Sequence, residues 1–133
     1  MNDDAIATAT ECLNAAESGS MTFPQIVGRL IKAGFESYEI NFRRSTATYF
    51  VPDGDCVELP IPPIEQPVSA QFDSASVQAA IKEAQKLVPG YTYRGFCEKV
   101  TKAGCAGYLV SFLGRRVLYV GRTGETHTEY FPN

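Results

Sequence analysis

The sequence predicts an α+β fold in which an α-α-β-β-β unit is duplicated within the chain, and the two copies pack into one pseudo-twofold domain with antiparallel meanders. Three observations support this prediction. Residues 21–54 match residues 91–124 at a shift of 70 without a gap. In both copies the apolar residues first follow helical spacing and then alternate. A proline-rich stretch stands between the two copies.

The match between the copies contains eight identities in 34 positions, whereas ordinary residue frequencies would give about two by chance. Two unrelated helix–hairpin units would also share residues where they need the same turns, but we favour a true duplication. The identical pairs are Thr22/Thr92, Lys32/Lys102, Ala33/Ala103, Gly34/Gly104, Tyr38/Tyr108, Phe42/Phe112, Tyr49/Tyr119 and Gly54/Gly124.

Each copy begins with two predicted helices. The second helix of the first copy starts at Thr22, because residues 22–25 read Thr-Phe-Pro-Gln, the form of a capping box with proline in the first turn. Gly34 follows a Lys-Ala pair, which is typical of a left-handed helix end. The helix before it has a weaker apolar stripe, whose phase matches the second copy at a shift of 71. This phase predicts one extra residue in the interhelical loop of the first copy.

A three-stranded meander follows the helices in each copy. Tyr38, Ile40 and Phe42 alternate with polar residues, as expected for a half-buried strand. Glycine-containing turns separate the later strands. The second strands are predicted at 46–51 and 116–120, the third strands at 56–59 and 126–130, and the turns before the third strands at Asp53-Gly54 and Thr123-Gly124.

The joint between the copies reads LPIPPIEQP at 59–67, and its four prolines exclude a helix or a central strand. We therefore expect a first repeat at 1–60, a proline-rich linker at 61–72 and a second repeat at 73–133. A unit of about 60 residues is marginally stable alone. We therefore expect residues 1–133 to form a single domain.

The strands of the two copies differ in character. In the second copy the segments GYLVSFL and RVLYV are apolar on both faces, whereas SYEINF in the first copy alternates cleanly. Strands buried on both faces read as continuous apolar runs. The strands of the second copy are therefore expected either to be central in a shared sheet or to face another subunit. The second alternative predicts a possible homodimer through the second-repeat strands.

Two long segments carry a resemblance to a known family. They read MTFPQIVGRLIKAGFESYEINFRRSTATYFVPDG and YRGFCEKVTKAGCAGYLVSFLGRRVLYVGRTGETHTEYFP. In these segments, which span almost the whole chain, the sequence resembles the YbcV-like family of small bacterial proteins. The resemblance implies no reaction, because that family has unknown function and no established catalytic motif. Many of its members are labelled phage envelope proteins, although such a component would more often show a membrane anchor or disulfides.

Composition and charge narrow the class of protein. The net charge is −3 and the longest clusters of one sign are pairs of residues, so the basic field with which nucleic-acid binders meet phosphates is missing. No run approaches the ~20 apolar residues that cross a bilayer, and the acidic start of the chain is unlike a signal peptide. We expect a cytoplasmic protein with no membrane partner, and we do not expect nucleic acid as the main partner.

The four cysteines form no CxxC pair, so neither a zinc ribbon nor a redox motif is predicted. Cys97 and Cys105 replace Val27 and Phe35 of the first copy, which favours small buried hydrophobic residues over reactive thiols. The sequence also has no phosphate-binding glycine loop and no dinucleotide fingerprint. We predict no metal and no cofactor.

His127, the only histidine, is the weak candidate for a catalytic residue. It lies at two-residue spacing from Glu125 and Glu129 on the last predicted strand, where a carboxylate could orient it as a general base. The alternative, which we favour, is the polar face of an exposed strand. A nucleophilic pair with Cys97 or Cys105 would need a thiolate-stabilising environment that the sequence does not show.

The candidate ligand-binding residues are Arg115, Arg116, Arg122 and Glu129. The three arginines lie within eight residues around a hairpin, and Arg43 and Arg44 stand at the corresponding corner of the first copy. If the repeats pack symmetrically, these corners could converge on an anion. The alternative, which we favour, is a solvated turn.

Two classes of function follow from these residues. The first is a non-enzymatic protein that binds a protein partner or a small ligand. The second is a small enzyme that uses His127 with a carboxylate or thiol on an anionic substrate. A deep cleft that holds His127 with Arg116 or Arg122 would favour the enzyme. A flat apolar patch on the second-repeat strands would favour the binding protein.

Overall fold

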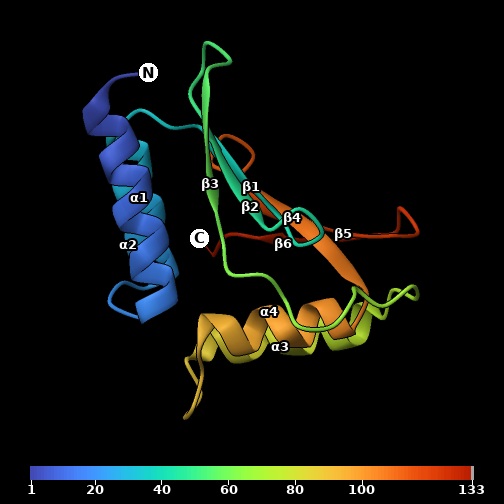
Figure 1. Cartoon of the computed structure of the whole chain (residues 1–133). Coiled ribbons are helices and arrows are strands. Elements are labelled where there is room, and N and C mark those ends of the chain that lie inside the picture. The colour runs from blue at the N-terminus through green and yellow to red at the C-terminus, as the bar shows by residue number, and fades with distance from the viewer. Residues whose placement is uncertain (133) are drawn as a thin grey trace.

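The computed structural model describes residues 1–132, which form four helices and six strands in the predicted α-α-β-β-β order, twice (Figure 1). The internal duplication is thus visible in the order of the elements. The elements of the first repeat are α1 (Asp3–Ser18), α2 (Phe23–Lys32), β1 (Ser37–Asn41), β2 (Thr46–Phe50) and β3 (Cys56–Pro60). Those of the second repeat are α3 (Ser74–Lys86), α4 (Tyr93–Lys102), β4 (Cys105–Ser111), β5 (Arg116–Gly121) and β6 (Thr126–Tyr130).

The two meanders form one six-stranded sheet with the order β3-β2-β1-β4-β5-β6, and all neighbouring strands are antiparallel. The repeats therefore join through β1 and β4, which are equally central. The expectation of a central position in a shared sheet is thus met by β4, whereas β5 lies one strand from the edge. Because β1 is equally central and yet polar on one face, a central position does not by itself explain why the second-repeat strands are apolar on both faces.

The register between β1 and β4 reveals a pseudo-twofold axis. Glu39 lies opposite Leu109, which is its own equivalent at the shift of 70. The hydrogen bond from Phe42 N to Ala106 O has its equivalent in the bond from Phe112 N to Glu36 O. The axis therefore passes through the Glu39–Leu109 pair, and the symmetry extends to single backbone hydrogen bonds.

The aromatic residues repeat this symmetry in the core. Tyr38 and Tyr49 stack with ring centroids 5.2 Å apart, and their equivalents Tyr108 and Tyr119 lie at 5.3 Å. The contact of Phe42 with Tyr108 at 6.0 Å and that of Tyr38 with Phe112 at 6.1 Å are also equivalent to each other. The repeated aromatics are thus core residues that pack across the axis.

The helix ends follow the predicted capping chemistry. Thr22 Oγ1 accepts from Gln25 N and Gln25 Oε1 accepts from Thr22 N, which completes the capping box. Gly34 and Gly104 follow the ends of α2 and α4 with φ of +98° and +96°, a conformation that favours glycine.

The predicted phase of the first helix is wrong. The buried residues Ala9, Cys12 and Leu13 of α1 correspond to Val77, Ala80 and Ile81 of α3, which is a shift of 68. The loop between the helices is accordingly longer in the second repeat, with residues 87–92 between α3 and α4 against 19–22 between α1 and α2. The alanine-rich stripe of α1 has too few large apolar residues to fix the phase.

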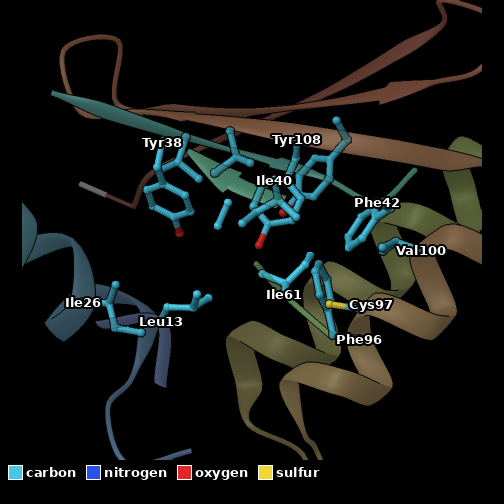
Figure 2. Close-up of a cluster of buried hydrophobic side chains, with 14 of the residues drawn as sticks. Leu13, Ile26, Tyr38, Ile40, Phe42, Ile61, Phe96, Cys97, Val100 and Tyr108 are labelled. Atoms are coloured by element: carbon cyan, nitrogen blue, oxygen red, sulfur yellow. The ribbon is translucent and has the colours of Figure 1, made fainter. Parts of the chain in front are cut away.

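Both helix pairs pack on the same face of the sheet (Figure 1). Side chains such as Tyr38, Ile40 and Tyr108 project from this face toward Leu13 of α1 and Phe96 of α4 (Figure 2). The opposite face of the sheet carries the alternate residues of every strand, which are half-buried or exposed. We call this second surface the open face.

The two ends of the linker are tied to different repeats: Ile61 N donates to the carbonyl oxygen of Ser45 in the first repeat, and residues 68–73 contact the second repeat. Ile61 and Val68 are buried, and the backbone nitrogens of Ser69 and Asp73 donate to the carbonyl oxygens of Thr101 and Ala103. These bonds satisfy backbone groups at the end of α4. The linker is therefore held at both ends, while Pro62, Pro63 and Pro67 between them are exposed.

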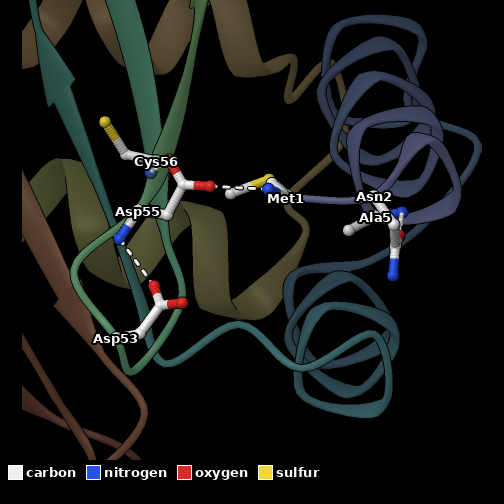
Figure 3. Close-up of polar contacts among 6 residues, drawn as sticks. All are labelled: Met1, Asn2, Ala5, Asp53, Asp55 and Cys56. Atoms are coloured by element: carbon white, nitrogen blue, oxygen red, sulfur yellow. Dashed lines mark hydrogen bonds and ion pairs between the residues drawn. The ribbon is translucent and has the colours of Figure 1, made fainter.

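The start of α1 is also tied to the first meander. The amino group of Met1 lies 2.6 Å from Oδ2 of Asp55, in the turn between β2 and β3 (Figure 3). The same turn is closed by Asp55 N, which donates to Asp53 Oδ1. Hydrogen bonding with Asp55 raises the pKa of the Met1 amino group, and the same contact lowers the pKa of the Asp55 carboxyl.

Candidate functional site

The side chains of Arg115 and Arg116 make their contacts near the hairpin that carries them. Arg115 donates from Nη2 to the carbonyl oxygen of Pro132 at 3.2 Å and lies 5.6 Å over the ring of Phe131. Arg116 donates from Nε to the carbonyl oxygen of Gly114 at 3.1 Å and stacks 4.7 Å over the ring of Tyr130. Both guanidinium groups thus hold the β4–β5 hairpin to the end of β6.

Arg122 lies at the other end of β5 from these residues. Its Nη1 donates to the carbonyl oxygen of Val68 at 3.0 Å, so it anchors the linker. About six extended residues separate it from Arg116, which corresponds to about 20 Å. The three arginines that are close in the sequence are therefore not brought together.

The convergence of the two arginine corners, which the sequence left open as the less favoured alternative, does not occur. Because β1 and β4 are antiparallel, Asn41 at the end of β1 lies opposite Gly107 near the start of β4. The hairpin that carries Arg43 and Arg44 therefore lies at the opposite end of the sheet from the hairpin that carries Arg115. Symmetric packing therefore places Arg43 and Arg44 at the end of the sheet away from Arg115 and Arg116.

Glu129 lies on the helix-covered face, because it is the cross-strand neighbour of the buried Val117. Arg116 is the cross-strand neighbour of Tyr130 and lies on the open face. The predicted ligand-binding residues are thus divided between two faces and two ends of the sheet. The structure offers no common site for Arg115, Arg116, Arg122 and Glu129.

His127 pairs with Glu129 as the two-residue spacing suggests. The distance from Nε2 to Oε2 is 3.1 Å, and the side chains are 18% and 25% exposed. The ring of His127 lies 6.3 Å from that of Tyr119 on the helix-covered face. Arg116 lies on the other face, and Arg122 bonds to the linker, so neither of the expected anion-binding groups is beside the histidine.

The buried cysteines do not have the properties of nucleophiles. Cys97 and Cys105 are both 0% exposed. Burial raises the pKa of the Cys97 thiol to about 12 and that of the Cys105 thiol to about 11, which is opposite to the shift that activates a thiol. The prediction that they act as small buried hydrophobic residues is confirmed.

Residues 1–132 contain no group of three or more histidine, cysteine, aspartate or glutamate side chains placed to hold a metal ion. A surface hollow of about 520 Å³ between the linker, α3 and α4 does contain charged groups. Three of the four charged groups already have partners, since Asp73 caps α3 and Glu83 pairs with Lys99 at 2.9 Å. The fourth, Lys102, is exposed.

The open face of the second repeat is the remaining candidate. Its centre is formed by Leu109, Leu118 and Val120, which alternate with the buried residues of β4 and β5 and are half-buried. None of the three packs into the core cluster formed with the helices. We call the complete surface the second-repeat open face; it consists of Gly107, Leu109, Ser111, Arg116, Leu118, Val120, Thr126, Thr128 and Tyr130.

The equivalent surface of the first repeat is more polar at its centre. At the equivalent positions Glu39 replaces Leu109 and Thr48 replaces Leu118, while Phe50 replaces Val120. Both sets lie in the same sheet and in the same backbone environment. The two leucines are thus not needed for the fold of a repeat. Sequence reasoning drew the possibility of an interface on the second-repeat strands from the apolar residues at both parities in GYLVSFL and RVLYV, but it did not assign individual residues to this face.

Comparison of the chain with models of known protein families and with curated protein sequences finds no match. The resemblance to the YbcV-like family therefore remains a prediction. Within the described residues, none of the helices has the length and apolar character required to cross a bilayer. The case for a function rests on the geometry of the chain itself.

Proposed function

We propose that this protein is a non-enzymatic binding module that engages a protein partner through the second-repeat open face. The observation that carries the proposal is the difference between the two repeats at equivalent positions. The first repeat serves as the comparison for the second. On the open face it carries the polar residues Glu39 and Thr48 where the second repeat carries the apolar residues Leu109 and Leu118.

The shape and composition of the surface favour a protein over a small molecule. Small-molecule sites are concave and enclose most of their ligand, whereas the face of a sheet is broad. Three apolar side chains at the centre and an Arg116–Tyr130 stack at the edge match the usual plan of a protein interface, with an apolar core and a polar rim. Arginine and tyrosine are also enriched among residues that dominate binding energy.

The alternative of an enzyme has less support. The His127–Glu129 pair is part-buried, but Arg116 lies on the opposite face and Arg122 holds the linker. A catalytic histidine needs a substrate-binding group within reach. The enzyme hypothesis predicts that His127→Ala abolishes a discovered activity, and unchanged activity would exclude it.

Site-specific photocrosslinking in the producing cells tests the binding proposal. A benzophenone-bearing amino acid is placed at position 118 in one variant and at the equivalent position 48 in a matched variant. We expect a covalent adduct with another polypeptide from position 118 and little or none from position 48. Equal labelling from both positions, or none from position 118, would contradict the proposal.

A further inference from the structure

We propose that the occupant of the second-repeat open face is a second copy of this chain, packed face to face about a twofold axis that runs parallel to the strands between β4 and β5. This inference rests on the proposed function, since it names the partner of the same surface. An isologous interface requires a surface that is complementary to itself, and the register of the sheet allows this requirement to be checked.

Rotation about this axis places β4 of one copy over β5 of the other. Each residue keeps its position along the strand direction. Cross-strand neighbours in one chain therefore become facing residues between copies. Leu109 and Leu118 are such neighbours, so Leu109 of each copy faces Leu118 of the other copy. The centre of the interface is then formed by four leucine side chains.

On either side of the leucines along the strands, large residues of one copy face small residues of the other. Gly107 is the cross-strand neighbour of Val120, and Ser111 is that of Arg116. After the rotation Val120 faces Gly107 of the second copy, and Arg116 faces Ser111. Alternation of large and small residues lets two sheet faces interdigitate at the ~10 Å separation of packed sheets.

The charges are compatible with this arrangement. The same rotation places β1 over β6 of the second copy. Glu39 then faces Thr128, a neutral hydroxyl that can donate to the carboxylate. Arg116 is drawn toward Tyr130 at the edge of the sheet and away from the axis. Glutamates of the two copies do not face each other, although the chain carries a net charge of −3.

The size of the contact predicts a weak dimer. Four strands overlap, and with spacings of about 4.8 Å between strands and about 3.3 Å along them the contact covers roughly 300 Å² in plan. Stable interfaces bury about 800 Å² of accessible surface on each partner. We therefore expect dissociation in the micromolar range, where monomer and dimer exchange.

Sedimentation velocity of the purified full chain, from about 1 to about 500 µM, tests the inference. Leu118→Gln and Thr48→Gln form a matched pair, since they place the same polar residue at equivalent positions of the two repeats. We expect a concentration-dependent dimer that Leu118→Gln weakens at least about tenfold and that Thr48→Gln leaves unchanged. Circular dichroism confirms that both variants are folded.

A second measurement locates the contact in case Leu118→Gln fails to fold. Heavy-isotope and unlabelled chains that carry the benzophenone group at position 118 are mixed, and the crosslinked peptides are analysed by mass. The inference requires a mixed-isotope adduct with β4, at or near Leu109. A dimer whose adduct lies elsewhere overturns it.

The outcomes separate this inference from the proposed function. A chain that remains monomeric throughout overturns the inference. If position 118 nevertheless captures a different protein in cells, the binding function stands with another partner. If position 118 captures nothing and the chain is monomeric, both proposals fail. A dimer that tolerates Leu118→Gln also excludes this face as the contact.

Discussion

Two equivalent glycines provide a direct test of how the linker is docked. Gly34 and Gly104 follow α2 and α4, with φ of +98° and +96°. A Cβ atom on Gly34 would meet nothing within 4 Å. A Cβ atom on Gly104 would overlap the backbone oxygen of Gln71 and would lie 2.7 Å from its carbonyl carbon and 2.8 Å from Cα of Phe72. The same substitution therefore has different consequences in the two repeats.

The expected loss of folding stability in each variant follows from the atoms around the glycine. Gly34→Ala introduces only left-handed strain, of about 1–2 kcal/mol. Gly104→Ala introduces the same strain and also displaces the linker, which endangers the bonds from Ser69 N and Asp73 N to the end of α4. Each such bond contributes about 1 kcal/mol, and lost burial of Val68, which is 4% exposed, costs about 1.5–3 kcal/mol. The difference between the variants should be about 3 kcal/mol or more.

Urea denaturation followed by circular dichroism measures this difference. We expect Gly104→Ala to lower the unfolding midpoint far more than Gly34→Ala, with similar m-values if both unfold in two states. A difference of about 3 kcal/mol is a large share of the total stability of a small domain. Equal destabilisation of the two variants would show that the linker does not press on Gly104, and the docked path of residues 68–73 would then be wrong.

Two further predictions concern buried polar groups. Glu17 and Arg94 join α1 to α4 at 2.5 Å, with side chains 23% and 27% exposed, so Glu17→Gln should cost on the order of 1–2 kcal/mol. The control Glu11→Gln removes a partner with a 63% exposed side chain and should cost less than about 0.5 kcal/mol in the same urea assay. Burial raises the pKa values of Cys97 and Cys105. Because the unfolded chain releases these protons from about pH 9 while the folded chain retains them, stability should fall as the pH rises from about 9 toward 12, and thermal midpoints that stay constant over this range would refute the prediction. The tyrosines that contribute in the same direction above about pH 10 are Tyr38, Tyr49, Tyr91, Tyr93, Tyr108 and Tyr119.

The sequence predicted the local structure well because local structure depends on neighbouring residues. The capping box at Thr22 and Gln25 formed as expected, since both of its hydrogen bonds join residues three apart. The alternation of Tyr38 and Ile40 with polar residues identified the buried face of β1. The repeat doubled this information, because each element was supported by two versions of its sequence.

The candidate site was harder to predict because it depends on which strands are neighbours. Arg116 and Arg122 look adjacent in the sequence, but an extended strand separates them by about 20 Å. Arg116 and Glu129 are close along the sheet and still lie on opposite faces, because the faces alternate with every residue. No local sequence pattern encodes the pairing of β1 with β4. This pairing makes β1 and β4 equally central, yet β1 is polar on its open face, so a central position does not explain the apolar residues on both faces of β4.

The pseudo-twofold axis also explains why the repeats differ where they do. Glu39 and Leu109 face each other across this axis. Two identical copies would place either two glutamates or two leucines in direct opposition there. Opposed like charges destabilise a sheet, and opposed leucines would extend the apolar surface into the first repeat. A fused chain avoids both outcomes, since each copy can carry a different residue. The same freedom places the two leucines of the open face, Leu109 and Leu118, on β4 and β5 of the second repeat only.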